Sequence, residues 1–482
     1  MYNVIKFGAE GIAFAKEQAV MNDRVHADHT WPENYAFDVY YPQEGKEYDS
    51  IGIQKAIDAA YDNGGGTVFV PAGDYLIAPI KLKSNVILEL APGATLWGSP
   101  NIKDYYDGKK ESLQLISDYC PGSGDLQDDD HVYINRLVSA VDADNTGITG
   151  YGEINAQSPH FIFPWLNKNH TEEDGTYTIG ERKIIRPKEM IVFKNCTNVT
   201  LRDFNICNSV YWTLVMFECD GVLIDGLKLD NFEGPNADGI DLVASSNVTI
   251  SNCRIHVGDD AICMKNVKPD FTMRNITVTN CLLRTFCNGI KFGTETWGNF
   301  ENITISNLVI QTPENDFCHT HGGINLNSVD GGDVRNVNIS NIVMENVDCP
   351  LYLIVGKRSQ HQKAVREPQA GQMERISITN ITARNSKFPC FITGEPDSKI
   401  KDVFLSNIRI SKDRAIVTEP HTEPVPERPE QYPTPWRYGS RLEGDKLPAY
   451  GLYMRHVDGV KIENFNVDTA DEEVRPMIKE DN

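Results

Sequence analysis

The chain has 482 residues, a net charge of −22 and an isoelectric point of about 4.9. This length exceeds that of one compact core, which predicts either several domains or one repeat architecture. The negative charge argues against nucleic acid and anionic membrane surfaces as partners, and no apolar run in the sequence is long enough to span a membrane. The eleven cysteines form no CxxC pair, and their odd number excludes a complete disulfide framework.

Residues 1–100 are predicted to form an N-terminal cap and the first coils of a repeat. The segment 2–8 is predicted as a strand, and 11–50 as an irregular polar insertion. Apolar residues at helical spacing over 51–62 (IGIQKAIDAAYD), followed by three glycines, predict a short capping helix that ends there. Short strands are expected next, over 67–70, 75–80 and 86–90.

From Asn198 onward a nine-residue pattern recurs, for example NVTLRDFNI at 198 and NITVTNCLL at 275. Its alternation of apolar and polar residues is typical of a half-buried strand, and its units begin 23 to 57 residues apart, as in a stacked solenoid. We therefore expect a right-handed parallel β-helix with regular coils over 198–468, in a single domain over 1–482. Recurrent Ser/Thr-Asn pairs predict asparagines that hydrogen-bond along the stack.

Longer polar segments interrupt the repeat at 11–50, 100–135 and 155–186, and a proline-rich loop follows at 419–436. Proline cannot continue a sheet, so we expect the last of these to lie over the side of the β-helix. Loops of this length could close a cleft, which leads to the hypothesis of exo action on chain ends or oligosaccharides. The opening MYNVIKFGAEG shows no secretory signal.

Carboxylates cluster in the segment 236–265. Asp259 follows Asp238 by 21 residues, about one coil of a solenoid, so stacking would bring Asp238 beside Asp259 and Asp260. Neighbouring strand residues point to opposite faces, so both acids of the pair share a cleft only if the chain bends, which Gly258 permits. Clustered carboxylates repel each other, which should raise at least one pKa and supply both an acid and a base, as glycoside hydrolysis requires. Solvated turn residues are the alternative interpretation.

These motifs resemble those of glycoside hydrolase family 28, the polygalacturonase family, over most of the chain. NADGID matches the Asn-x-Asp pattern that begins at Asn236, VGDDAICMK matches Gly-Asp-Asp, and GYGEINA and NSVYWTL are further matches. The resemblance implies hydrolysis with inversion, with Asp259 as general acid and Asp238 and Asp260 as the pair that activates water. It implies no cofactor and no metal. Asp241 is interpreted as a turn or strand-end carboxylate.

Two departures from the family pattern concern the substrate. Asn288 stands where the family has histidine, and Asn325 and Asn327 stand where it has arginine and lysine. An amide carries neither a proton nor a charge, and the fork that binds a carboxylate is lost. We therefore expect a neutral or differently charged sugar, in a pectin-related linkage other than plain polygalacturonate. The expected substrate-binding residues are Asn236, Asn288, Lys291, Asn325, Asn327, Tyr352, Lys357 and Arg358.

The sequence thus predicts an inverting glycoside hydrolase that acts on a pectin-related or other plant or algal polysaccharide or oligosaccharide. A monomer is expected, either secreted or periplasmic, with a cytoplasmic location as the alternative. One rival hypothesis is a polysaccharide lyase on the same scaffold, in which the acid cluster would hold Ca²⁺. The other is a catalytically degenerate, carbohydrate-binding β-helix.

Overall fold

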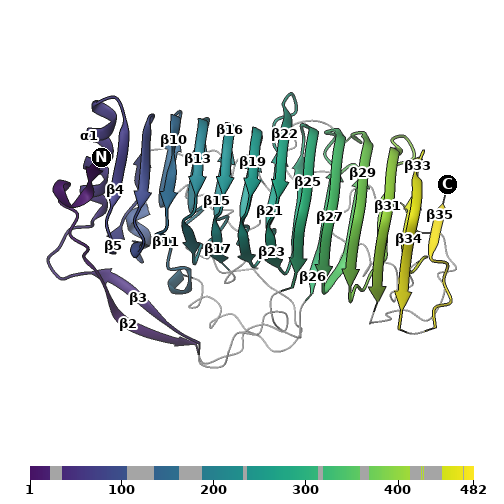
Figure 1. Ribbon diagram of the computed structural model, residues 1–482, viewed down its shortest axis with the longest axis horizontal. Helices are drawn as coiled ribbons and strands as arrows, with labels where there is room; N and C mark the ends of the chain where they lie inside the picture. The colour runs from purple at the N-terminus through teal and green to yellow at the C-terminus, as the bar shows by residue number, and fades with distance from the viewer. Residues whose placement is uncertain are drawn as a thin grey trace. The chain divides into compact units, whose positions relative to one another are not determined.

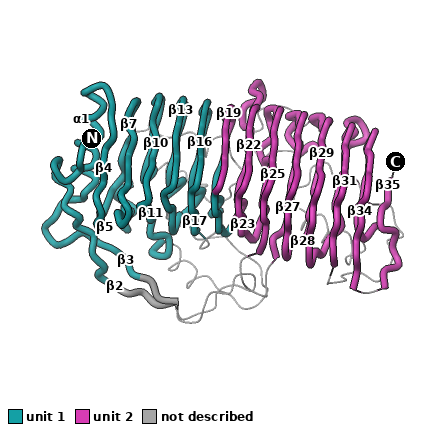
Figure 2. The backbone as a smooth tube through the Cα atoms, viewed as in Figure 1, with its two compact units in different colours: residues 1–241, 253–258, 315–318 teal, residues 242–252, 259–314, 319–482 magenta. Residues whose placement is uncertain are grey.

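The computed structural model describes residues 1–21, 35–105, 135–161, 187–231, 236–312, 319–358, 369–412, 425, 427, 448–470 and 472–481. Most of the loops expected at 100–135, 155–186 and 419–436 therefore lie outside the described residues. The chain forms two compact units (Figure 2), and each is described by itself. Unit 1 holds residues 1–241, 253–258 and 315–318, and unit 2 holds residues 242–252, 259–314 and 319–482.

Unit 1 opens with a two-residue strand, β1 (Tyr2–Asn3), and a 3-10 helix, η1 (Val4–Phe7). The prediction of a strand over 2–8 is therefore wrong beyond Asn3. The Asn3 side chain accepts a hydrogen bond from the Ile5 N–H at 3.0 Å and so caps the helical turn. Gly8, with a φ of 101°, ends it in the left-handed region.

The predicted irregular insertion at 11–50 contains a β-hairpin, which corrects that expectation. Strands β2 (Ala13–Met21) and β3 (Tyr35–Pro42) pair antiparallel and extend from the first coils of unit 1 (Figure 1). The Gln157 side chain fastens the hairpin, because it accepts from the Tyr40 N–H at 2.6 Å and donates to the Tyr40 carbonyl at 3.0 Å. The Tyr40 ring also stacks on the Trp97 ring, with 3.8 Å between the ring centroids.

The predicted capping helix is confirmed as α1 (Ser50–Asp62). Its buried stripe consists of Ile53, Ala56, Ile57 and Ala60, at the spacing of one helix face. This stripe packs against the first coil, including β4 (Gly66–Val70). The helix thus covers apolar residues that the first coil would otherwise expose to water.

The coils of unit 1 form three ladders in which each strand pairs parallel with its equivalent in the next coil. The first ladder contains β4, β7 (Val86–Leu90), β10 (Asp144–Gly150), β13 (Thr197–Arg202) and β16 (Asp220–Asp225). The second contains β5 (Gly73–Ile77), β8 (Ala94–Gly98), β11 (Glu153–Asn155), β14 (Asn205–Cys207), β17 (Lys228–Asn231) and β20 (Arg254–Val257). The third contains β6 (Ile80–Leu82), β9 (Val138–Val141), β12 (Ile191–Lys194) and β15 (Leu214–Phe217).

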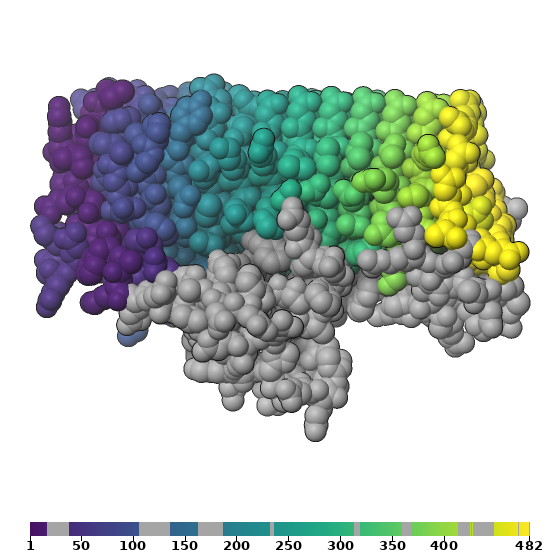
Figure 3. All heavy atoms as spheres, turned by 60° about the horizontal axis from the view of Figure 1, so that its bottom comes forward, coloured from purple at the N-terminus to yellow at the C-terminus, as the bar shows by residue number. Residues whose placement is uncertain are grey.

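Unit 2 has the same plan, with longer strands in two main ladders. The first contains β19 (Ser246–Ser251), β22 (Thr272–Thr279), β25 (Asn299–Gln311), β27 (Val334–Glu345), β29 (Met373–Arg384), β31 (Ile400–Lys412) and β34 (Lys461–Thr469). The second, here called the site ladder, contains β21 (Ile262–Asn266), β24 (Asn288–Thr296), β26 (Thr320–Ser328), β28 (Val347–Val355), β30 (Cys390–Thr393), β32 (Leu452–Arg455) and β35 (Ile478–Asp481). Parallel pairing from coil to coil makes each unit a parallel β-helix. Figure 3 shows the described residues as successive bands of colour in chain order.

The register confirms the repeat read from the sequence. Within unit 2, the second residue of each nine-residue repeat pairs with the second residue of the next repeat, and these side chains are buried. The paired residues are Val248, Ile276, Ile303, Val337, Ile376 and Val403. All of these side chains point inward in one register. The insertions between successive repeats therefore lie outside the paired strands and do not shift the core residues.

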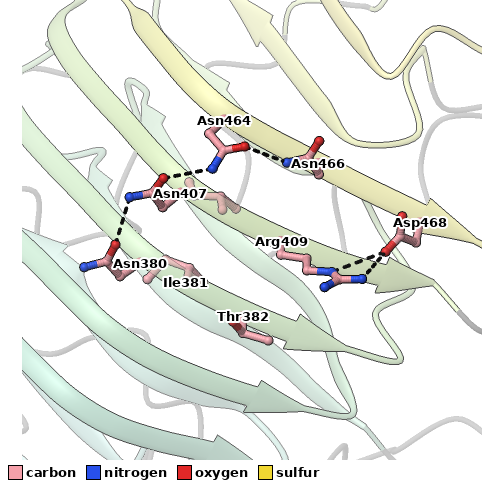
Figure 4. A pocket seen from close by; sticks show the side chains of 9 residues that line it. Asn380, Ile381, Thr382, Asn407, Arg409, Asn464, Asn466 and Asp468 are labelled. Carbon is pink, nitrogen blue, oxygen red and sulfur yellow. Dashed lines mark hydrogen bonds and ion pairs between the residues drawn. The ribbon is translucent and has the colours of Figure 1, made fainter.

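Asparagines at the bends of unit 2 form the predicted ladder. Asn380 donates from Nδ2 to Asn341 Oδ1 at 3.0 Å, and Asn407 donates in the same way to Asn380 at 3.1 Å. Asn464 and Asn466 continue the chain of amides (Figure 4). Asn380 has a φ of 57°, which asparagine tolerates better than most residues. Among the described helices, none has the length and apolar composition needed to cross a membrane.

Candidate active site

Asp259 and Asp260 lie in the bend between β20 and β21, where the chain leaves strand geometry, as the sequence required. The Asp260 N–H donates to Asp259 Oδ1 at 2.9 Å. The next coil holds the bend, because the Thr285 hydroxyl donates to the Asp259 carbonyl and the Ala261 N–H donates to the Asn288 carbonyl at 2.8 Å. Asp260 is buried, whereas Asp259 is partly exposed.

Both oxygens of Asp260 have charged or polar partners. Oδ2 lies 2.9 Å from Lys291 Nζ, and Oδ1 accepts a hydrogen bond from Asn288 Nδ2 at 2.6 Å. Burial by itself raises the pKa of a carboxyl group. Here the positive charges of Lys291 and Lys265, together with these hydrogen bonds, outweigh it and lower the pKa of Asp260. Asp260 is therefore held as a carboxylate.

The pKa of Asp259 is shifted in the opposite direction, upward. Burial and the negative charge of Asp260 raise its pKa by more than the nearby lysines lower it. Of the two groups, Asp259 therefore holds a proton more tightly, and Asp260 ionises first. Two carboxyl groups with pKa values pushed apart by their surroundings are the arrangement that supplies a general acid and a general base.

The structure brings four of the predicted substrate-binding residues into this site. Asn288 and Lys291 contact Asp260 directly, as described above. Asn325 pairs with Lys291 across the ladder, and its Nδ2 donates to Asn288 Oδ1 at 3.1 Å. Asn327, two residues further on β26, donates from Nδ2 to the Phe292 carbonyl at 2.9 Å. All four side chains are buried.

Three other predicted substrate-binding residues have different surroundings. Tyr352 on β28 is buried in an apolar cluster with Phe391 and Tyr453, packed together with Val425 and Ala449. Arg358 forms two hydrogen bonds to Asp330, at 3.0 Å and 2.8 Å, and is buried as well. Lys357 binds Asp397 at 2.7 Å near the surface. Lys357 and Arg358 are therefore both paired with aspartates of the protein.

The remaining predicted residues belong to unit 1. Asn236 has a φ of 58° and is partly exposed. Asp238 is buried, and its backbone carbonyl accepts from the Thr213 N–H at 3.0 Å. Asp241 is fully buried and is the second residue of β18 (Ile240–Val243), so it lies near the end of a strand and not in a turn.

A hard cation would find poor ligands in this part of unit 2. Asp259, Asp260 and Cys287 place ligand atoms within 4.8 Å of one another. Calcium prefers oxygen ligands, whereas Lys291 already occupies one oxygen of Asp260. Burial and the two neighbouring carboxylates raise the pKa of the Cys287 thiol, which keeps it protonated. The donor set fits acid–base chemistry better than a calcium site.

Lys265 was not among the site residues chosen from the sequence. It lies two residues after Cys263 on β21, so both side chains share one face, and its Nζ lies 3.2 Å from Cys263 Sγ. Lys265 is buried, and its charge helps to lower the pKa of Asp260. A lysine at an outward position of a strand that follows two aspartates was the signal that could have identified it.

The fold and the acid pair define a class of protein: a parallel β-helix enzyme equipped for general acid–base catalysis. Residues 67–424 match the glycosyl hydrolases family 28, so the chain belongs to this family and is a glycoside hydrolase. It is 25% identical over 371 residues to an endo-polygalacturonase of Pectobacterium carotovorum, covering 75% of this chain and 84% of the relative.

Solved structures confirm the right-handed parallel β-helix. A family 28 exopolygalacturonase of Yersinia enterocolitica aligns with 99% of this chain and 78% of its own, at 19% identity and a TM-score of 0.64. An exopolygalacturonase of Thermotoga maritima aligns with 85% of this chain and 86% of its own, at 22% identity and a TM-score of 0.60. These likenesses show the fold.

Proposed function

We propose that this enzyme hydrolyses a pectin-related polysaccharide or oligosaccharide with inversion of the anomeric centre. The observation that carries the proposal is the opposite pKa shift of the neighbouring Asp259 and Asp260, together with the contacts that cause it. Asp259 keeps a proton and donates it to the leaving glycosidic oxygen. Asp260, held ionised by Lys291 and Asn288, accepts a proton from the attacking water.

The role of Asp238 is proposed from the sequence. It lies about one coil before the acid pair and stands in the Asn-x-Asp motif that resembles the family pattern. A second carboxylate near the water would strengthen the base and orient the nucleophile. We assign Asp238 to this task with Asp260, which leaves Asp259 as the single general acid.

A pectic substrate is proposed from the relatives, whose names describe polygalacturonases. The protein adds a constraint of its own, because two of its cations, Lys291 beside the acids and Arg358 after β28, are each paired with a carboxylate. Lys291 binds Asp260, and Arg358 binds Asp330. A substrate rich in galacturonate at every position would find few unpaired charges here, so we favour a pectin-related linkage other than plain polygalacturonate.

Exo action, or action on oligosaccharides, is supported by the burial of the outward-facing side chains at one end of the site ladder. Lys291, Asn325, Tyr352, Phe391 and Tyr453 lie in one row by register. Its first members are polar: Lys291 contacts Asp260, and Asn325 donates to Asn288. The later members, Tyr352, Phe391 and Tyr453, are buried together with Val425. The covered part begins two coils, or about 10 Å, from Lys291. This leaves room for a short stretch of substrate on that side.

Val425 and Glu427 also make polar contacts with the end of the site ladder. The Val425 carbonyl accepts from Arg455 at 2.7 Å, and Glu427 forms an ion pair with Arg455 at 3.3 Å and a hydrogen bond with His456 Nε2 at 2.7 Å. These contacts support a fixed wall at this end of the row. Short products from the start of the reaction are expected, whereas an early mixture of long fragments would contradict exo action.

The test of the proposed function compares the wild type with Asp259→Asn on a panel of pectic and neutral glycans. General acid catalysis contributes about 10²–10⁴ in rate, so a loss of this size in kcat is expected, with inverted products from the wild type by NMR. Asp468→Asn is the control, because this aspartate is exposed and pairs with Arg409 on the first ladder. Products with an unsaturated end would instead establish a lyase, and binding without turnover would establish a binding protein.

A further inference from the structure

Asn325 and Asn327 lie on β26, and Asn325 is linked to Asp260 through the Asn288 side chain. They lie two residues apart on β26, and strand alternation places both on the face that also carries Lys291. Both side chains are fully buried. Gly293, on the preceding strand, contributes no side chain here, and a Cβ built at that position would lie 3.9 Å from Asn327 Cβ.

The hydrogen bonds determine which end of each amide is the donor. Ionised Asp260 only accepts, so Asn288 must present Nδ2 to it, which leaves Asn288 Oδ1 as an acceptor on the other side. Asn325 must therefore present its own Nδ2 to Asn288. Asn327 presents Nδ2 to the Phe292 carbonyl, which also only accepts. The charge on Asp260 and one backbone carbonyl thus orient all three amides.

With the amides oriented in this way, two side-chain carbonyl oxygens remain without a hydrogen-bond donor among the described residues. Within the described part of the chain, Asn325 Oδ1 and Asn327 Oδ1 are buried and have no hydrogen-bond partner. A buried acceptor without a donor is unfavourable for the folded protein, and such atoms call for an explanation. A ligand that supplies hydroxyl donors would satisfy both oxygens.

We propose that Asn325 and Asn327 are an acceptor pair for the hydroxyl groups of a neutral sugar residue in the substrate, bound beside Asp260. This inference rests on the proposed function and names the substrate class at that position. A hydroxyl group donates to a carbonyl oxygen, whereas a uronate carboxylate cannot donate and would face two carbonyl oxygens and the ionised Asp260. The pair therefore selects a neutral residue that presents hydroxyl donors here and disfavours a uronate that presents its carboxylate to the same two oxygens.

The experiment measures binding by calorimetry to the full chain carrying Asp259→Asn, so that turnover does not interfere. The probes are trigalacturonate and the same trisaccharide with each carboxylate reduced to a hydroxymethyl group. We expect the reduced probe to bind roughly tenfold more tightly, a difference of about 1.4 kcal/mol that lies within the cost of leaving one buried polar group unpaired. Asn325→Leu, which removes one acceptor at similar volume, should abolish most of this preference.

Asn327→Lys in the same background should reverse the preference, because it replaces an acceptor by a cation. Val474→Lys is the matched control, since it adds the same charge at an exposed valine and should leave the preference unchanged. Tighter binding of trigalacturonate, equal binding of both probes, binding of neither, or a preference retained in Asn325→Leu would each overturn the acceptor pair. If Asn327→Lys does not fold, the result for Asn325→Leu decides. A retained preference with no hydrolysis of any glycan would refute the proposed function instead.

Discussion

Replacing Lys291 by methionine tests the electrostatic basis of the site most directly. The substitution keeps most of the side-chain volume and removes the charge 2.9 Å from Asp260 Oδ2. At this distance, with an effective dielectric constant of about 20, the attraction is about 6 kcal/mol. The cost of burying both charges offsets part of it, and Lys265 and Asn288 remain. We therefore expect Lys291→Met to lower the free energy of unfolding by about 3 kcal/mol at neutral pH.

The pH dependence of this effect has a definite sign. Asp260 has a folded-state pKa below the usual 3.8, so its contribution to stability is present above that value and is lost as the pH falls through the folded pKa. The difference between wild type and Lys291→Met should thus be largest at neutral pH and shrink in acid. In the variant the pKa of Asp260 rises, so the acidic limb of kcat/KM should move to higher pH.

The assays are urea unfolding across the pH range and pH–rate profiles on the substrate that the glycan panel identifies. Lys291→Arg keeps the charge and should retain most of the stability and the position of the acidic limb. Arg384→Met removes an exposed ion pair with Glu345 and should cost less than about 1 kcal/mol. An unfolding free energy and an acidic limb in Lys291→Met that both match the wild type would refute the assignment of Lys291 as the group that keeps Asp260 ionised.

Three further predictions concern the scaffold and the site. Arg358→Met leaves Asp330 buried without its cation and should cost about 3–5 kcal/mol, whereas Lys357→Met, beside an exposed partner, should cost less than about 1 kcal/mol; urea unfolding measures both. Asn380→Ala should cost about 2 kcal/mol, because it breaks the ladder at a φ of 57°, and Asn380→Gly should recover part of that loss in thermal unfolding. Asn288→Ala should raise the pKa of Asp260, so the acidic limb should move to higher pH by less than in Lys291→Met; an unmoved limb would show that this hydrogen bond does not set the charge.

The sequence by itself determined the fold, because the repeat is a local pattern. Each unit alternates apolar and polar residues, and the register of Ile276 with Ile303 and Val337 follows from keeping the apolar set inside. The spacing of the repeat also located the acid pair, because Asp259 and Asp260 follow Asp238 by about one coil and adjoin Gly258. The 3-10 helix after Asn3 and the hairpin of β2 and β3 were missed, because a side-chain cap and contacts with Gln157 stabilise them.

Only the tertiary structure decided what the polar residues around the acids do. The sequence suggested that Asn288 and Asn325 bind substrate, but it could not show that they form a donor chain ending on Asp260. Nor could it show that Asp330 takes up the charge of Arg358, which lies 28 residues further along the chain. A strand pattern states which face a side chain points to. The partner it meets on that face depends on the coils before and after, so the charges and pKa values of this site are properties of the stacked structure.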